Sequence, residues 1–84
     1  MGLIVAPNPV AGRATISYSV AAGSEQVRIA LTDLLGREVR VLENGPKAAG
    51  TQTLDLNAAN LAAGTYLVKV QQGARTATRK VVLL

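Results

Sequence analysis

Few residues of this chain could take part in chemistry. The sequence has nine basic and five acidic side chains but neither histidine nor cysteine. Without those two residue types it cannot build a serine–histidine–aspartate triad, a cysteine nucleophile, or an imidazole or thiolate metal site. The five acids are too scattered to predict a catalytic carboxylate pair, and no glycine-rich phosphate loop is present. We therefore expect no enzymatic activity and no catalytic residue.

One short segment carries the oxygen ligands that calcium prefers. Asp55, Asn57 and Asn60 fall within a few residues of one another, but the segment lacks the acid density and the closing glutamate of an EF-hand loop. Asparagine side chains in such positions also form Asx turns and cap short helical turns. We favour this second interpretation and predict neither a metal site nor a cofactor.

The positive charge is concentrated at the end of the chain. Residues 1–68 hold five bases and five acids, whereas residues 69–84 hold Lys69, Arg75, Arg79 and Lys80 and no acid. Nucleic-acid binding is not expected, because no aromatic side chains are interleaved with these bases for stacking. Bases on edge strands discourage aggregation of sheets. We favour this interpretation over the two alternatives, an acidic partner and an anionic surface.

The elements that carry these residues show apolar side chains at alternate positions, which is the period of β-strands. The expected strands cover residues 3–6, 14–20, 26–32, 38–41, 51–56, 65–71 and 75–84. Seven short strands without a helix predict an all-β fold, a seven-stranded antiparallel immunoglobulin-like β-sandwich. A length of 84 residues is typical of a single domain, which we place at residues 1–84.

Glycine, proline and asparagine mark the expected connections between strands. The predicted turns are Pro7-Asn8-Pro9, Ala22-Gly23-Ser24, Asp33-Leu34-Leu35-Gly36, Asn44-Gly45-Pro46 and Gln72-Gly73, and residues 57–63 are expected to form a helical turn or coil. Gly36 is free to take a positive φ, which a tight hairpin connection requires.

Two strands lead to specific expectations about burial. Val39 and Val41 alternate with Glu38 and Arg40 and are expected to form the apolar face of their strand. The apolar run over residues 81–84 does not alternate, which suggests a strand covered on both faces.

Tyr66 is a candidate for a tyrosine corner. Together with Leu61 and Gly64 it resembles the entry to strand F of immunoglobulin-like sandwiches, where a tyrosine hydroxyl bonds back to the backbone a few residues upstream. An ordinary core aromatic is the alternative, and Tyr66→Phe would separate the two.

Targeting signals are not evident in the sequence. No stretch approaches the roughly 18 apolar residues of a membrane-spanning helix. Met1-Gly2-Leu3 lacks the basic region of a signal peptide, and residues 1–2 are expected to be an added start.

Five pieces of the sequence follow one another in a characteristic order, across nearly all of residues 5–84. They are Pro7-Asn8-Pro9, the hairpin with Asp33, Gly36 and Arg37, the segment Ala49-Gly50-Thr51, the spacing Leu61-x-x-Gly64-x-Tyr66, and the closing Lys80-Val81-Val82-Leu83. In this order they resemble a known family, the type A C-terminal sorting domains of the type IX secretion system of Bacteroidetes-type bacteria.

The resemblance implies a function that the composition does not. Such domains are folded sorting signals at the C-terminus of exported proteins. Outer-membrane type IX translocon components recognise the domain after the exported protein, the passenger, has reached the periplasm. A sortase-like peptidase then usually removes the domain, and the passenger is released or attached to the cell surface. In this interpretation the chain is a substrate of the machinery and carries no catalytic role of its own.

We expect the recognition surface to lie on the last two strands. Its candidate residues are Lys69, Arg75, Arg79, Lys80, Val81, Val82, Leu83 and Leu84. For Val81 and Leu83, completion of the core is at least as good an interpretation. Asn8, with its flanking prolines, is either a contact element or a rigid entry turn, and we favour the turn.

Two other functions are compatible with the sequence. An immunoglobulin-like structural or adhesion spacer has the same strand pattern. A carbohydrate-binding sandwich is disfavoured because the chain has no tryptophan and no phenylalanine. The oligomeric state does not follow from the sequence.

Overall fold

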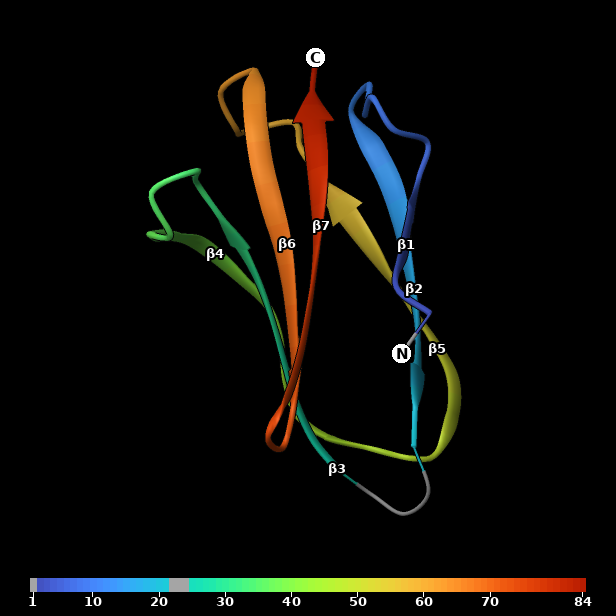
Figure 1. Ribbon diagram of the computed structural model, residues 1–84. Coiled ribbons are helices and arrows are strands. Elements are labelled where there is room, and N and C mark those ends of the chain that lie inside the picture. The colour runs from blue at the N-terminus through green and yellow to red at the C-terminus, as the bar shows by residue number, and fades with distance from the viewer. Residues whose placement is uncertain (1, 22–24) are drawn as a thin grey trace.

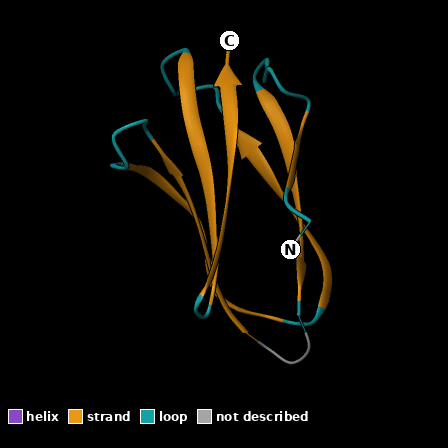
Figure 2. Cartoon of the chain, viewed as in Figure 1, coloured by secondary structure: helices purple, strands orange, loops and turns teal. Residues whose placement is uncertain are grey.

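The structure, a computed structural model, describes residues 2–21 and 25–84 and consists of seven strands in two layers (Figures 1 and 2). The strands are β1 Ile4–Ala6, β2 Arg13–Val20, β3 Glu25–Thr32, β4 Glu38–Lys47, β5 Gly50–Asn57, β6 Gly64–Gln72 and β7 Arg75–Leu83. One sheet, here sheet A, has the order β1-β2-β5, and the other, sheet B, has the order β4-β3-β6-β7. The pairs within both sheets are antiparallel.

This architecture confirms the predicted immunoglobulin-like β-sandwich, with one topological detail that the sequence did not show. In a constant-type immunoglobulin domain the fourth strand lies beside the fifth, in the four-stranded sheet. Here β4 pairs with β3. The three strands of sheet A therefore face the four strands of sheet B.

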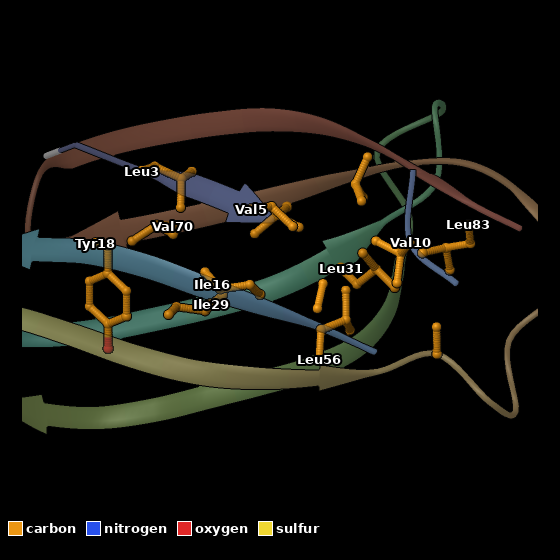
Figure 3. Packing of buried hydrophobic residues seen from close by; sticks show 14 of the residues in the cluster. Leu3, Val5, Val10, Ile16, Tyr18, Ile29, Leu31, Leu56, Val70 and Leu83 are labelled. Atoms are coloured by element: carbon orange, nitrogen blue, oxygen red, sulfur yellow. The ribbon is translucent and has the colours of Figure 1, made fainter. Parts of the chain in front are cut away.

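The core fills the space between the two sheets (Figure 3). Alternate side chains of the central strands point into it: Ile16 and Tyr18 on β2, and Ile29 and Leu31 on β3, are 2% exposed or less. The pattern arises because successive side chains of a strand point to opposite faces of the sheet. The alternation in the sequence had predicted these inward faces correctly.

The second half of β4 departs from its prediction. The turn expected at Asn44-Gly45-Pro46 is wrong, because β4 continues to Lys47 and the chain bends only at residues 48–49. Pro46 lies opposite Gln26 of β3. A proline without an N–H is tolerated there because β4 is an edge strand.

The first half of β4 also differs from expectation. Val39 and Val41 are 42% and 46% exposed and do not form a buried face, while Arg40 and Leu42 are half-buried. The pairing of β3 with β4 shifts register twice, after Ile29 and after Leu31. Each β-bulge inserts a residue and re-aims the following side chains, so simple alternation fails.

The remaining predicted connections agree with the structure to different degrees. The hairpin between β3 and β4 is confirmed, with Gly36 at φ 86°. The turn between β6 and β7 is confirmed but lies one residue later, at Gly73 and Ala74. Residues 58–63 form a loop with a turn at residues 59–60, which the Leu61 N–H closes by donating to the Ala58 carbonyl at 3.0 Å. The predicted turn at Ala22-Gly23-Ser24 lies outside the described residues.

Candidate recognition surface

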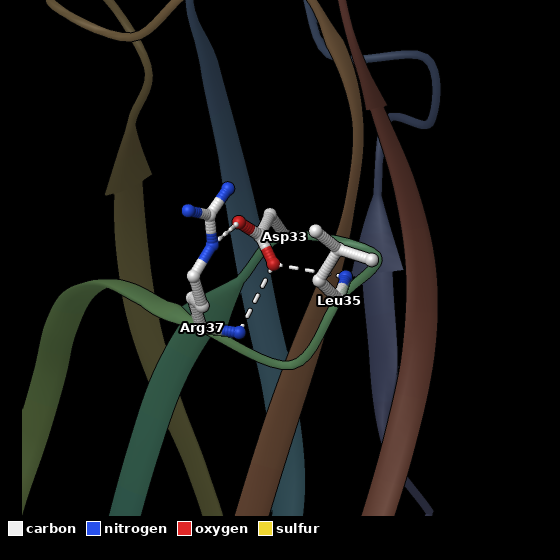
Figure 4. A network of polar contacts seen from close by, with 3 residues as sticks. All are labelled: Asp33, Leu35 and Arg37. Carbon is white, nitrogen blue, oxygen red and sulfur yellow. Dashed lines mark hydrogen bonds and ion pairs between the residues drawn. The ribbon is translucent and has the colours of Figure 1, made fainter.

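The β3–β4 hairpin is held by one carboxylate (Figure 4). Asp33 Oδ1 accepts hydrogen bonds from the backbone N–H groups of Leu35 at 2.9 Å and Arg37 at 3.0 Å, and its Oδ2 accepts from Arg37 Nε at 2.8 Å. Gly36 closes the turn by donating its N–H to the Asp33 carbonyl. Asp33, Gly36 and Arg37 therefore form one small structural unit.

These contacts shift the titration of Asp33. The hydrogen bond from the Arg37 backbone N–H is the main cause that lowers the pKa of the Asp33 carboxyl below its ordinary value, and the Arg37 guanidinium and the Leu35 N–H add to it. A lowered pKa in the folded state means that the ionised form stabilises the hairpin. This stabilisation is present above the ordinary carboxyl pKa and is lost as the pH falls through the lowered value.

Tyr66 forms the predicted tyrosine corner. Its hydroxyl donates to the carbonyl oxygen of Ala62 at 2.7 Å, four residues upstream. Leu61 and Tyr66 are both half-buried and pack against the core, and Gly64 begins β6 opposite Leu83 of β7. Through these contacts, Leu61 and Tyr66 hold the β5–β6 loop against sheet B.

Asn8 fastens the segment after β1 to the last strand. Its Nδ2 donates to the Lys80 carbonyl at 3.0 Å and its Oδ1 accepts from the Val82 N–H at 3.1 Å. The peptide bonds before Pro7 and Pro9 are both cis. The side chain of Asn8 therefore has a structural task beyond forming a turn.

Val10 continues this attachment of residues 8–10 to β7, and the sequence does not predict its contacts. Its N–H donates to the Val82 carbonyl at 2.7 Å, and its carbonyl accepts from the Leu84 N–H at 2.9 Å. Val10 is fully buried and forms a parallel bridge with Leu83. Its only signal in the sequence is an isolated apolar residue after the prolines. We call residues 8–10 with their bonds to β7 the β7 clip.

The four predicted basic residues do not form one cluster. Lys69 and Lys80 lie on the outer face of sheet B, on adjacent strands, because Lys69 is opposite Thr78 and Lys80 is opposite Leu67. Arg79 points the other way and donates from Nε to the Leu3 carbonyl of the opposite layer at 3.1 Å. Arg75 lies beside the β6–β7 turn, opposite Gln72.

The end of β7 alternates between core and surface. Val81 and Leu83 are buried at 0% and 2% exposure, whereas Leu84 is 74% exposed and Val82 is half-buried. The expectation of a strand covered on both faces is therefore wrong, because sheet A covers only the inner face of sheet B and the outer face, with Lys69 and Lys80, is exposed. Val81 and Leu83 complete the core, which was the alternative interpretation.

The segment from Asp55 to Asn60 has the geometry of an Asx turn. Asn57 Oδ1 accepts from the Ala59 N–H at 3.0 Å. Across the part of the chain that the structure describes, no three acidic side chains lie close enough together to hold a metal ion. Asp55 lies on the outer face of sheet A and lines a shallow depression with Arg13 and Thr15.

Comparison with known proteins decides the family. The family described as "Secretion system C-terminal sorting domain" matches residues 4–84. The chain belongs to this family. Its type IX sorting signal implies export of the protein that carries it, to the cell surface or into the medium. No curated protein matches the chain.

A solved structure supports the fold of this sorting domain. PorZ of Porphyromonas gingivalis, described as an essential bacterial surface component of the type IX secretion system, matches with a TM-score of 0.65 and 22% sequence identity. The match covers 99% of this chain and 11% of the PorZ chain. At this identity the likeness concerns the fold alone. Among the described residues of the sorting domain, no helix is long and apolar enough to cross a bilayer.

Proposed function

We propose that this sorting domain is a non-catalytic C-terminal signal, which outer-membrane type IX translocon components recognise in its folded form. The family match over residues 4–84 carries the proposal. The structure supports a folded signal, because Asp33, Tyr66 and Asn8 of the family pattern all bond to backbone groups. Residues with such tasks maintain a shape that a partner can recognise.

The later steps of the pathway belong to the same proposal. The passenger crosses the periplasm, the domain is recognised, and a sortase-like peptidase removes it in exchange for cell-surface attachment or release. The lack of histidine and cysteine supports a substrate role in these steps. No nucleic acid takes part.

The outer face of sheet B is our candidate for first recognition. Lys69 and Lys80 are exposed there on adjacent strands. The nearby Glu38 is already occupied by Arg28, whose guanidinium donates to it at 2.6 Å. Within residues 2–21 and 25–84, no acidic side chain forms an ion pair with Lys69 or Lys80, so these two lysines attract an acidic partner surface. Of the remaining candidate residues, Arg75, Arg79 and Leu84 are exposed and Val82 is half-buried.

A fusion experiment tests the signal and this face together. Residues 3–84 are joined to a fluorescent protein with a signal peptide in a bacterium that has a type IX system, and the fraction of fluorescence outside the outer membrane is measured. Lys69→Glu and Lys80→Glu are each expected to reduce export by about tenfold, as loss of one strong charged contact would. Arg13→Glu, on the outer face of sheet A, changes the net charge equally and is the matched control.

The outcomes distinguish the functions. Export of the parent fusion with retention of the two lysine variants supports the proposal. Equal loss of export in Arg13→Glu would indicate a response to net charge and contradict a specific basic face. Retention of the parent fusion in the periplasm would contradict the sorting function and leave the structural spacer module as the better account.

A further inference from the structure

The four edges of the two sheets are protected to very different degrees. An open edge offers unpaired backbone groups to any extended chain, and proteins usually block it. β1 has only three residues, and the β7 clip covers the end of β7. β4 has two register shifts and Pro46. β5, in contrast, has eight residues, and its pairing with β2 shows no register shift.

The free backbone groups of β5 can be identified. The Ala58 N–H donates to the Gly12 carbonyl at 2.8 Å, so the even-numbered residues of β5 bond to β2 and the odd-numbered residues point away from it. Arg40 Nη1 donates to the Asn57 carbonyl at 2.8 Å, which agrees with this assignment. Thr51, Thr53 and Asp55 therefore present their N–H and C=O groups at an edge that has no neighbouring strand within residues 2–21 and 25–84.

The place beside β5 is also incomplete on its inner side. β1 contacts β7, so the strand orders place β5 over β3 and leave β4 beyond the edge of sheet A. Leu42 of β4 and Leu54 of β5 pack against the core but are only partly buried. A fourth strand in sheet A would cover both leucines, in the position that the fourth strand of a constant-type immunoglobulin domain occupies.

We propose that the open edge of β5 is a strand-addition site that takes one extended segment of a partner protein with apolar side chains at alternate positions. Its backbone pairs with Thr51, Thr53 and Asp55, and its apolar side chains cover Leu42 and Leu54. The partner belongs to the export machinery, so the inference rests on the proposed function. The site lies on a different sheet from Lys69 and Lys80 and is a second contact.

The position of β4 beyond the edge of sheet A favours a single added segment and disfavours a second copy of this domain. Two β5 strands that paired antiparallel would be related by a twofold axis perpendicular to the sheet, which keeps both B sheets on the same side. The partner's β3 would then enter the space that β4 already fills, and the partner's β4 would enter the space of β3. An isolated extended segment needs only the place beside β5.

Two variants of the fusion test the site by different means. Thr53→Pro removes an outward N–H without breaking the ladder to β2. Gln52→Lys keeps every backbone N–H of β5. It puts a charge on the core-facing side of the strand, where an added strand would bury it. Gln52 is already half-buried and polar, so we expect the Gln52→Lys domain to fold. Thr53→Val, which keeps the N–H and removes the hydroxyl, is the matched control.

We expect both variants to reduce export by about tenfold, while Thr53→Val stays within about twofold of the parent. Circular dichroism melts of the purified domains show which variants are folded. A folded Thr53→Pro or Gln52→Lys domain that is exported like the parent overturns the proposal, and Gln52→Lys decides alone if Thr53→Pro does not fold. A domain dimer abolished by Thr53→Pro would assign the edge to a second copy and overturn it too. If the parent fusion is not exported, the proposed function fails and this inference falls with it, whereas normal export of folded variants removes only the strand-addition site.

Discussion

At the scale of single residues, the polar side chains of the family pattern act mainly on nearby backbone. Asp33 accepts from two N–H groups of its own hairpin, and Tyr66 donates to a carbonyl four residues upstream. Both contacts can be predicted from the sequence, because each joins residues that are close together in the chain. The contacts of Asn8 with β7 were not predictable in this way, since 72 residues separate Asn8 from Lys80.

The tyrosine corner gives a prediction for one atom. Tyr66→Phe removes the hydroxyl that donates to the Ala62 carbonyl and leaves the ring in place. We expect the free energy of unfolding to fall by about 1 kcal/mol, the net value of one such hydrogen bond. Urea titration followed by circular dichroism measures the change.

A second tyrosine supplies the control for this measurement. Tyr18 is 2% exposed, and its hydroxyl donates no hydrogen bond to a described residue. Tyr18→Phe therefore makes the same chemical change without the same loss. If Tyr66→Phe costs no more than Tyr18→Phe, the corner does not stabilise the fold and Tyr66 acts only as a core aromatic.

At the scale of elements, alternation predicted the central strands better than the edges. β2, β3 and β6 have a partner on both sides, and their inward residues followed the period of two. β4 did not, because its register shifts and Pro46 are adaptations of an edge strand to solvent. Gly45 and Pro46 are typical turn residues in isolation. Only their pairing with β3 shows that the strand continues through them.

The β7 clip is an element whose strength can be measured. Asn8→Ala removes both side-chain hydrogen bonds to the Lys80 carbonyl and the Val82 N–H. We expect a loss of about 1–2 kcal/mol in unfolding free energy, from two exposed bonds of about 0.5–1.5 kcal/mol each. We also expect faster amide hydrogen exchange at Val82, because that N–H loses its acceptor.

An exposed asparagine elsewhere provides the comparison for the clip. Asn60 lies in the loop between β5 and β6, and Asn60→Ala is expected to change the unfolding free energy by less than about 0.5 kcal/mol. Unchanged exchange at Val82 in Asn8→Ala would mean that the bonds of Val10 alone hold the segment to β7.

At the scale of the whole molecule, the arrangement of surfaces depends on contacts that the sequence does not order. The four bases of residues 69–84 are close in the chain, yet Lys69 and Lys80 lie on an outer face while Arg79 reaches across to the Leu3 carbonyl. The open edge of β5 likewise depends on β4 joining β3. Alternation fixes the faces of each strand but does not assign strands to sheets.

The last strand joins stability to function in a way that affects any truncation. Val81 and Leu83 are 0% and 2% exposed, and burying such side chains contributes about 1.5–3 kcal/mol each. The β7 clip also bonds to residues 80–84. A sandwich of this size is held by no more than about 5–15 kcal/mol in total. We therefore expect the chain without residues 79–84 to be unfolded, with no cooperative melt by circular dichroism and rapid proteolysis. Lost export after this deletion would then reflect loss of the fold, whereas a truncated domain that melts cooperatively would show that β7 contributes less to the core than its burial indicates.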